Sequence, residues 1–553
     1  MTSAAEPLLS VRGLSIPLPV ESDRPYAVRD ISYDLARGEI LCVVGESGSG
    51  KSMTANAIMG LLPPYLKPSA GNIVYGGRDL LARPQEELRE LRGREIAMIF
   101  QEPLSALNPL MTVGEQIDEV MLVHGEKDAA KRTARVLELL DYVGLPDPPT
   151  LRNTYPFRLS GGQRQRVVIA MALALEPSIL IADEPTTALD VTTQAQIIEL
   201  IKRIQRAKGM GVMFVTHDFG VVADIADRVV VMEKGLVVEA GPAGQVLNAP
   251  RHPYTRRLIA AVPHRRGEES DVPEEGAEEK LLLEIRSLSK TYHRGGGLFS
   301  KARDIPALRD VSLKLAAGQT LGVVGESGSG KSTLGRAILK LIESDSGQIL
   351  YRGQDIAGLS PSAFRPLRRK LQMIFQDPFA SLNPRQTIGR ILIDGPLANG
   401  IRLEEARGRA EQLLARVGLD PSAYDRYPHE FSGGQRQRVG IARALALDPE
   451  VLIADESVSA LDVSVQEQVL KLLKEVQDNL KLGMIFITHD LRVAAQICDS
   501  IMVMRRGEVV EAGPPSQIFD APRHEYTQRL IAAIPGQGWD PQKAVHPERE
   551  EIL

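Results

Sequence analysis

The octapeptide Gly-Glu-Ser-Gly-Ser-Gly-Lys-Ser occurs at Gly45–Ser52 and again, unchanged, at Gly325–Ser332. Each copy fits G-x-x-x-x-G-K-[ST], the pattern of a loop whose backbone N–H groups surround nucleotide phosphates. Two copies identical over eight residues indicate that one nucleotide-binding module was duplicated. The period continues along the chain, because Lys331 follows Lys51 by 280 residues and Asp455 follows Asp183 by 272.

The composition agrees with two ordinary globular modules. The 553 residues are too many for one core, and two modules of about 265 residues suit the usual domain size. A net charge of −5 argues against a nucleic-acid groove, which would normally be basic. Two cysteines, Cys42 and Cys498, are too few for a disulfide framework or a four-ligand metal site. We therefore expect buried free thiols and a reducing cytoplasm.

The ends and the middle of the chain differ from the modules. No apolar run reaches the roughly 18 residues needed to span a bilayer, and Met1–Val11 lacks the pattern of a signal peptide. The acidic stretch His264–Lys280 indicates a flexible linker, and Gly295–Arg303 a flexible loop insertion. The expected parts are a first domain at 1–263, a linker at 264–280, a second domain at 281–535 and a loose tail at 536–553.

Short apolar runs alternate with helix-like stretches in both modules. The runs Ile40–Val44 and Thr320–Val324 lead into the glycine-rich loops. The runs Ser178–Ala182 and Glu450–Ala454 stop at Asp-Glu, and Val212–Thr216 and Met484–Thr488 stop at His-Asp. This pattern predicts an α/β fold with a parallel sheet covered by helices on both faces. In such sheets ligands bind beyond the carboxyl ends of the strands, where these charged residues fall.

The glycine-rich loops have the chemistry of phosphate sites. Gly45, Gly48 and Gly50 let the backbone approach phosphate without a Cβ atom in the way, and the following helix offers its N-terminus to the same anion. Lys51 supplies a charge for the β- and γ-phosphates, and the Ser52 hydroxyl is suited to Mg²⁺. The second module offers the same groups: Gly325, Gly328, Gly330, Lys331 and Ser332.

Acidic residues follow one expected strand of each module. Asp183 is suited to hold Mg²⁺ through oxygen, and Glu184 to orient an attacking water as a general base. His217, at the end of another strand, is placed to reach the γ-phosphate. The second module repeats these roles with Asp455, Glu456 and His489. The alternative for Asp-Glu after a strand is a helix N-cap, which two repeats behind a phosphate loop disfavour.

Each module carries a second anion site. The runs Leu159–Gln163 and Phe431–Gln435 place Ser-Gly-Gly-Gln at the start of a helix-like stretch, where backbone N–H groups attract anions. One nucleotide does not need two cradles from the same module, so we expect each Ser-Gly-Gly loop to close over the nucleotide of the other module. The residues are Ser160, Gly161, Gly162 and Gln163, and Ser432, Gly433, Gly434 and Gln435.

Together these motifs resemble those of ATPase subunits of ATP-binding-cassette (ABC) transporters, in which two modules sandwich two ATP molecules head to tail. The resemblance implies P-loop NTPase domains with a RecA-like core, an antiparallel β subdomain and a helical subdomain. It implies that Gln101 and Gln376 sense Mg²⁺ and water, and that Tyr292 stacks on adenine. In the first module the aromatic position falls on Leu18, or on Tyr26 after a register shift.

The resemblance also implies two complete composite sites that bind ATP and Mg²⁺ and hydrolyse ATP. One combines Lys51, Asp183, Glu184 and His217 with Ser432 and Gly434, and the other Lys331, Asp455, Glu456 and His489 with Ser160 and Gly162. Ser47 and Ser327 belong to the same nucleotide-binding loops, and the loops that connect the two sites are Thr187–Asp190 and Ser459–Asp462.

Further runs are similar to those of a narrower group, the ATPases of peptide, nickel and opine importers. They are Phe100–Pro109 and Phe375–Pro384, and the runs that end in Tyr-Thr, Ala249–Thr255 and Ala521–Thr527. In that group the two ATPases are often separate subunits, and this chain resembles their fusion in the glutathione and microcin C uptake systems. The first subunit type commonly carries a cysteine cluster for an iron–sulfur centre, but Arg256–Lys280 contains no cysteine, so no such cluster is expected.

The resemblance implies two integral-membrane permease subunits as partners and an external solute-binding protein, with no nucleic acid. The chain would then lie at the cytoplasmic face of the bacterial inner membrane, with segments near Gln101 and Gln376 transmitting closure to the permeases. The alternative is a soluble twin-cassette ATPase that acts on the ribosome or on DNA. A short acidic linker and the absence of zinc-binding cysteines argue against it. The motifs do not specify the solute, whether dipeptide, oligopeptide, glutathione, opine or another.

Overall fold

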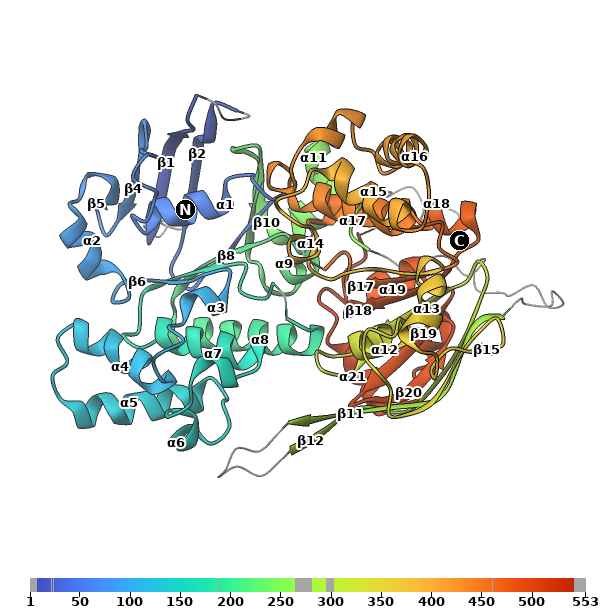
Figure 1. The fold of residues 1–553 in the computed structure, drawn as a ribbon. Helices are drawn as coiled ribbons and strands as arrows, with labels where there is room; N and C mark the ends of the chain where they lie inside the picture. The colour runs from blue at the N-terminus through green and yellow to red at the C-terminus, as the bar shows by residue number, and fades with distance from the viewer. Residues whose placement is uncertain are drawn as a thin grey trace, which may run out of the picture. The chain divides into compact units, whose positions relative to one another are not determined.

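The chain divides into two compact units in a computed structural model (Figure 1). The structure describes residues 7–20, 22, 24–187, 189–263, 281–294, 303–459 and 461–541. One unit contains Met1–Leu189, Thr193–Val262 and Pro535–Leu553, and the other contains Asp190–Thr192 and Pro263–Ile534. The expected linker lies outside the described residues, as do most of the expected loop insertion and of the tail. The domain boundaries stay predictions.

The first unit contains two sheets. The antiparallel sheet has the order β2-β1-β4-β5, with β1 (Leu9–Pro17), β2 (Tyr26–Leu35), β4 (Ala70–Tyr75) and β5 (Arg78–Asp79). The larger sheet has the order β10-β9-β3-β8-β7-β6, with β3 (Ile40–Val44), β6 (Ile96–Ile99), β7 (Ile179–Asp183), β8 (Gly211–Thr216), β9 (Arg228–Glu233) and β10 (Leu236–Pro242). All its neighbours pair in parallel except β9 and β10.

The parallel strands are apolar because the sheet is covered on both faces. Every residue of β3, β7 and β8 is buried, so no polar residue alternates along them. Helix α1 (Lys51–Ile58) packs against β7, and α9 (Phe219–Ile225) against β3 and β8. The predicted α/β core is confirmed. Cys42 in β3 and Cys498 are both buried free thiols, as predicted.

A helical layer follows β6 in the first unit, at the lower left of Figure 1. It contains α3 (Pro103–Ala106), α4 (Val113–Val123), α5 (Ala129–Tyr142), α6 (Pro148–Leu151) and α7 (Gly161–Ala172). The remaining helices of this unit are α2 (Gln85–Leu91), α8 (Val191–Lys208), α10 (Ala243–Asn248) and α11 (Pro253–Ala260). This layer and the antiparallel sheet confirm the two expected subdomains.

The second unit repeats the arrangement. Its antiparallel sheet, β12-β11-β14-β15, contains β11 (Leu281–Arg294), β12 (Arg303–Ala316), β14 (Ser346–Tyr351) and β15 (Gln354–Asp355). Its larger sheet, β16-β17-β18-β13-β19-β20, contains β13 (Thr320–Val324), β16 (Leu371–Ile374), β17 (Val451–Asp455), β18 (Gly483–Thr488), β19 (Ser500–Arg505) and β20 (Glu508–Gly513). The helices are α12 (Lys331–Ile338), α13 (Pro361–Phe364), α14 (Pro378–Ser381), α15 (Ile388–Ala398), α16 (Leu403–Arg416), α17 (Gly433–Leu445), α18 (Val463–Leu480), α19 (Leu491–Ile497), α20 (Pro515–Asp520) and α21 (Glu525–Ala532).

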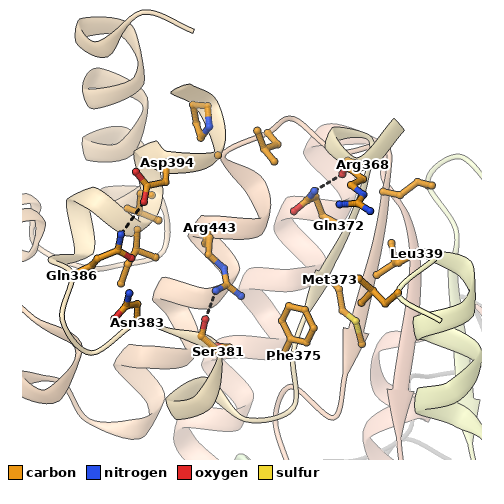
Figure 2. Close-up of a pocket in the computed structure, with 17 residues that line it drawn as sticks. Leu339, Arg368, Gln372, Met373, Phe375, Ser381, Asn383, Gln386, Asp394 and Arg443 are labelled. Atoms are coloured by element: carbon orange, nitrogen blue, oxygen red, sulfur yellow. Dashed lines mark hydrogen bonds between the residues drawn. The ribbon is translucent and has the colours of Figure 1, made fainter. Parts of the chain in front are cut away.

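A groove separates β16 from the helical layer of the second unit (Figure 2). Its volume is about 440 Å³, and its lining includes Met373 in β16, Phe375 directly after β16 and Asp394 on α15. Arg443 of α17 donates a hydrogen bond to the carbonyl oxygen of Ser381, and its guanidinium carbon lies 5.8 Å from the centre of the Phe375 ring. Both walls of the groove mix apolar and polar side chains, with Gln372 beside Met373 on the strand and Ile391 beside Asp394 on α15.

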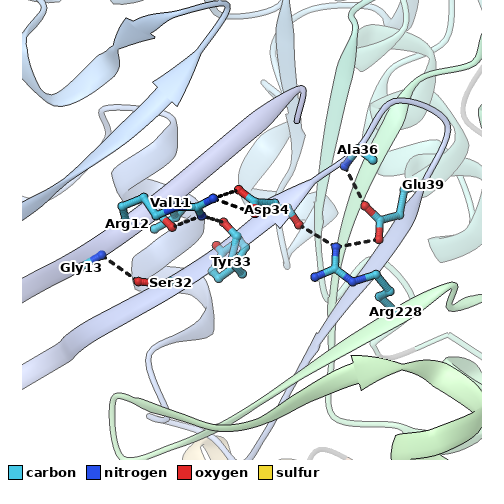
Figure 3. A network of polar contacts seen from close by, with 9 residues as sticks. All are labelled: Val11, Arg12, Gly13, Ser32, Tyr33, Asp34, Ala36, Glu39 and Arg228. Carbon is cyan, nitrogen blue, oxygen red and sulfur yellow. Dashed lines mark hydrogen bonds and ion pairs between the residues drawn. The ribbon is translucent and has the colours of Figure 1, made fainter. Parts of the chain in front are cut away.

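A polar network joins the two sheets of the first unit (Figure 3). Arg228 of β9 donates to the backbone carbonyl of Asp34 at 3.3 Å and lies 3.1 Å from the Glu39 carboxylate. The other oxygen of Glu39 accepts from the N–H of Ala36 at 2.7 Å, and Arg12 of β1 pairs with Asp34 at 2.6 Å. These contacts fix the turn between β2 and β3, from which the strand that precedes the glycine-rich loop starts.

We expect Phe214→Ala to destabilise the first unit by about 3–5 kcal/mol, because Phe214 in β8 is fully buried and its truncation leaves a cavity. Urea unfolding followed by circular dichroism measures this. Phe157→Ala is the matched control, since Phe157 is 62% exposed, and should change stability by no more than about 0.5 kcal/mol. Equal effects of both substitutions would contradict the assigned core.

Candidate functional site

Both glycine-rich loops turn where only glycine fits. The first follows β3 and ends where α1 begins at Lys51. A Cβ atom on Gly45 would lie 2.2 Å from the Met232 carbonyl oxygen, and φ of Gly45 is +152°. A Cβ atom on Gly325 would lie at the same distance from the Met504 carbonyl oxygen. The loop can therefore lie directly against the neighbouring strand, with its N–H groups at the carboxyl edge of the sheet.

The loop lysines are buried and directed back into their own loops. Lys51 Nζ donates to the carbonyls of Gly45 at 2.7 Å and Glu46 at 2.9 Å, and Lys331 makes the same two contacts at 2.8 and 2.9 Å. Burial lowers the pKa of Lys331, and the nearby carboxylates of Glu456 and Asp455 oppose this shift. Each ammonium group thus lies at its own loop, in a position to bind an anion there.

A hydroxyl and a carboxylate face each other below each loop. Ser52 Oγ donates to Asp183 Oδ1 at 2.9 Å, and Ser332 Oγ to Asp455 Oδ1 at 3.0 Å. Burial raises the pKa of Asp183 and of Asp455 above the ordinary value, although the serine hydrogen bond opposes it. A buried carboxylate beside a hydroxyl fits a hard cation, which would offset its charge.

The oxygen set of each unit suits Mg²⁺ held jointly with phosphate. No cluster of three or more His, Cys, Asp or Glu side chains suited to a metal occurs among the described residues. Ser52 and Asp183 therefore supply only part of an octahedral shell, as is usual for Mg²⁺ at phosphate sites. Gln101, the third expected ligand, directs its Nε2 to Glu184 Oε2 at 3.1 Å.

Glu184 is the centre of a second cluster. Its Oε2 accepts from Gln101 and from the Thr187 hydroxyl, at 3.1 and 3.0 Å, and lies 3.4 Å from His217 Nδ1. In the second unit, Glu456 Oε2 accepts from Gln376 Nε2 at 2.7 Å and lies 3.7 Å from His489 Nδ1. The structure thus brings together the glutamate, glutamine and histidine that the sequence places far apart.

The two glutamates ionise readily. Burial opposes the charge on Glu184, but its hydrogen bond with His217 and the charges of His217 and Lys51 outweigh burial and lower its pKa to about 2. The pKa of Glu456 is also lowered, since burial is outweighed by the hydrogen bond and charge of His489. Both side chains are carboxylates at neutral pH, the form that a general base requires.

The backbone of both glutamates was not anticipated from the sequence. Glu184 has φ +47° and Glu456 φ +44°, the left-handed region, which costs a side chain-bearing residue about 1–3 kcal/mol. The alternative of a helix N-cap is wrong, because Asp183 ends β7 and the next helix begins only at Val191. The strained turn directs the carboxylate towards Gln101 and His217 instead.

The Ser-Gly-Gly-Gln loops begin helices, as expected. Ser160 caps α7, its Oγ accepting from the N–H of Gln163 while the Gln163 side chain accepts from the Ser160 N–H. Ser432 and Gln435 form the same capping box on α17. A Cβ atom on Gly162 would lie 2.4 Å from Thr193 Cγ2, so the glycine is required by packing against α8.

The strand register settles which residue of the first unit matches Tyr292. Tyr292 is 40% exposed on β11 and follows Thr291, which pairs with Pro306. In the first unit Pro17 pairs with Tyr26, so Tyr26 matches Pro306 and Leu18 matches Tyr292. The first unit therefore offers an aliphatic side chain there.

Tyr254 and Tyr526 were not among the expected site residues, although their runs were noted. The hydroxyl of Tyr254, on α11, accepts from the N–H of Glu46 in the first glycine-rich loop at 3.2 Å. The hydroxyl of Tyr526, on α21, accepts from the N–H of Glu326 at 3.1 Å. The signal was present, since the His-x-Tyr-Thr run recurs with the period of the loops.

Comparison with known families matches this geometry. The family described as "ABC transporter" matches residues 28–187 and 308–459, and "Oligopeptide/dipeptide transporter, C-terminal region" matches 238–292 and 510–551. The chain belongs to the ABC transporter family. It is an ABC ATPase with two tandem ATP-binding domains, each of the P-loop fold.

Similar curated proteins cover nearly the whole chain. "Glutathione import ATP-binding protein GsiA" of Shigella boydii serotype 4 is 46% identical over 96% of this chain and 89% of its own length. The proteins of the same name from Escherichia coli O6:H1 and Salmonella typhimurium are each 47% identical with the same coverage. Among solved structures, one titled as a post-hydrolysis dimer of the ATP-binding cassette MJ0796 bound to ADP and Pi is 31% identical. It covers 42% of this chain and 98% of its own, with a TM-score of 0.39.

The described helices of this ABC ATPase include none that is both long and apolar enough to cross a membrane.

The low pKa of Glu184 predicts a pH-dependent contribution to stability. Its pKa falls from an ordinary 4.5 to about 2 on folding, so its ionised form stabilises the fold above pH 4.5, and this contribution is lost as pH falls towards 2. We expect the difference in Tm between wild type and Glu184→Gln to stay level from pH 6 to about pH 5 and to decrease as pH falls further to about 3. Thermal unfolding at a series of pH values measures this, and a difference that stays level down to pH 3 would contradict the low pKa of Glu184.

Proposed function

We propose that this ABC ATPase powers a bacterial importer for peptides or related solutes by hydrolysing ATP at two sites. The observation that carries the proposal is the cluster of Glu184, Gln101 and His217 beside the glycine-rich loop, repeated in the second unit. The relatives named for glutathione import support a solute of the peptide class.

Each group has a role that follows from its place. Lys51 gives up contacts to its own loop carbonyls for the β- and γ-phosphates of ATP. Ser52, Asp183 and Gln101 would hold Mg²⁺, which would supply positive charge for the phosphate oxygens. The Glu184 carboxylate accepts the proton of the attacking water, and His217 holds that carboxylate in place and approaches the γ-phosphate. The second unit uses Lys331, Ser332, Asp455, Gln376, Glu456 and His489 in the same roles.

We infer that each ATP is completed by the Ser-Gly-Gly loop of the other unit. Within its own unit, each such loop is the N-terminus of a long buried helix, with N–H groups suited to phosphate. Ser432, Gly433, Gly434 and Gln435 would complete the first site, and Ser160, Gly161, Gly162 and Gln163 the second. Tyr292 would stack on the adenine of the second site, and Leu18 would contact that of the first.

The groove beside Gln376 is the proposed docking site for a permease. Phe375, directly before Gln376, is 39% exposed in the groove, and Phe100, directly before Gln101, is 41% exposed. A short amphipathic segment of a permease would bury such a ring and stay linked to the glutamine that contacts the base. The importer would place this chain at the cytoplasmic face of the inner membrane, with a solute-binding protein outside.

We expect Glu184→Gln and Glu456→Gln each to lower steady-state ATP turnover, because each removes the base of one site. A general base contributes about 10²–10⁴-fold to the step that it serves, so the double variant should be nearly inactive. Phosphate release under saturating MgATP measures turnover.

The control for this experiment is Glu199→Gln, an exposed glutamate on α8, which should leave turnover unchanged. If either active-site variant retained full turnover, its site would not hydrolyse ATP and the two-site proposal would fail.

We expect Phe375→Ala to weaken association with the permease subunits, because the ring lines the groove. ATP binding by the isolated chain should persist, since Phe375 is not one of the proposed phosphate-binding residues. Co-purification from detergent-solubilised membranes measures association. Leu403→Ala, which removes a 58% exposed side chain outside the groove, is the control. Unchanged recovery of the permeases with Phe375→Ala would argue against this docking site.

A further inference from the structure

The tyrosines of the two His-x-Tyr-Thr runs contact the phosphate loops from behind. Tyr254 and Tyr526 are each 3% exposed, and each hydroxyl accepts one hydrogen bond from a loop N–H, that of Glu46 or of Glu326. These glutamates occupy the second position of the octapeptide in both units. The same contact thus occurs twice, with ordinary distances of 3.2 and 3.1 Å.

The surrounding residues hold each tyrosine rigidly. The Glu239 carboxylate accepts the N–H groups of Arg251 and His252 at 2.8 and 3.1 Å, and His252 Nδ1 caps α11 by accepting from the N–H of Tyr254 at 3.2 Å. Glu511, Arg523, His524 and Tyr526 repeat every contact in the second unit, at 2.8, 3.1 and 3.0 Å. These contacts fix the start of α11 and of α21, and with it the backbone of each tyrosine.

A cation lies over each tyrosine ring, although the two units supply it differently. The guanidinium carbon of Arg257 is 5.7 Å from the centre of the Tyr254 ring, and Arg257 pairs with Glu233 at the end of β9. In the second unit the guanidinium carbon of Arg505, at the end of β19, lies 4.9 Å from the centre of the Tyr526 ring. The two units place different arginines over the equivalent tyrosine ring, which indicates that a cation at this ring is maintained.

The backbone of Glu46 is held from two sides. Its carbonyl accepts from Lys51 Nζ at 2.9 Å, and its N–H donates to Tyr254. When Lys51 turns to phosphate, its bond to the carbonyl weakens, whereas the bond from the Glu46 N–H to the tyrosine does not involve Lys51. The tyrosine bond therefore keeps the start of the loop in place in both states.

The hydroxyls stay protonated at physiological pH. Burial raises the pKa of Tyr526 to about 12, although the hydrogen bond from the Glu326 N–H opposes this shift. Burial raises the pKa of Tyr254 as well. A neutral phenol can accept from the loop N–H without adding negative charge beside the triphosphate.

We propose that Tyr254 and Tyr526 are positioning residues that pre-order the first and second phosphate loops for nucleotide. The proposal rests on the proposed function, since it takes the glycine-rich loops as the ATP sites. Each tyrosine acts only on the loop of its own unit, and neither touches the nucleotide.

The test uses the full chain with one site disabled. In a Lys331→Ala background only the first loop binds MgATP, and in a Lys51→Ala background only the second. Tyr254→Phe should weaken MgATP binding about fivefold in the first background and leave it unchanged in the second, because one hydrogen bond to the loop is lost. Tyr526→Phe should show the opposite pattern. Isothermal titration calorimetry measures both.

Tyr75→Phe is the matched control, because it removes a hydroxyl that donates to Glu95 at 2.9 Å in the same unit as Tyr254 but away from the loop. It should leave MgATP affinity unchanged. Hydrogen exchange gives a second readout, since the Glu46 amide should exchange faster in Tyr254→Phe, while Tm stays within about 2 °C.

The outcomes separate the two proposals. A background protein that binds no MgATP at its remaining site would overturn the proposed function itself. Normal binding in the backgrounds with no effect of the Phe variants would overturn only the role of the tyrosines. An equal loss at both sites with lowered Tm would show a general structural role and would also overturn it.

Discussion

Gly45 and Gly325 lie so close to the carbonyl oxygens of Met232 and Met504 that a Cβ atom would be only 2.2 Å away. This approach lets the loop pass tightly from β3 to α1, and from β13 to α12, at the carboxyl edge of the sheet. The loop then presents Lys51 and Ser52 to the residues that end β7 and β8. Every proposed contact with nucleotide depends on that turn, and the strands beside it supply the carboxylates and histidines.

The strands and their polar ends could be predicted because a sheet covered on both faces demands unbroken apolar runs, and a parallel sheet gathers their carboxyl ends at one edge. Asp183, Glu184 and His217 therefore came together as expected. Other features could not be read from the sequence. The left-handed turn at Glu184 involves no glycine, and the bond from Glu46 to Tyr254 joins residues 208 positions apart. That Leu18, and not Tyr26, matches Tyr292 became evident only from the strand register.

The two units share the same cluster of glutamate, glutamine and histidine but differ around it. Glu456 takes a shorter hydrogen bond from Gln376, 2.7 Å, than Glu184 takes from Gln101, 3.1 Å. Thr187 donates to the Glu184 carboxylate, whereas Ser459 donates to the Glu456 carbonyl at 3.1 Å. Tyr292 has only Leu18 as its counterpart. The proposed catalytic groups are therefore the same in both units, and only the residues around them have diverged since the duplication.

The central claim is that each triphosphate is held by the glycine-rich loop of one unit and the Ser-Gly-Gly loop of the other. The most direct measurement is an experimental structure of the Glu184→Gln/Glu456→Gln chain with MgATP. We expect two ATP molecules, one in contact with Lys51 and Ser432 and one with Lys331 and Ser160. Nucleotide bound at either glycine-rich loop with both Ser-Gly-Gly loops open to solvent would contradict it.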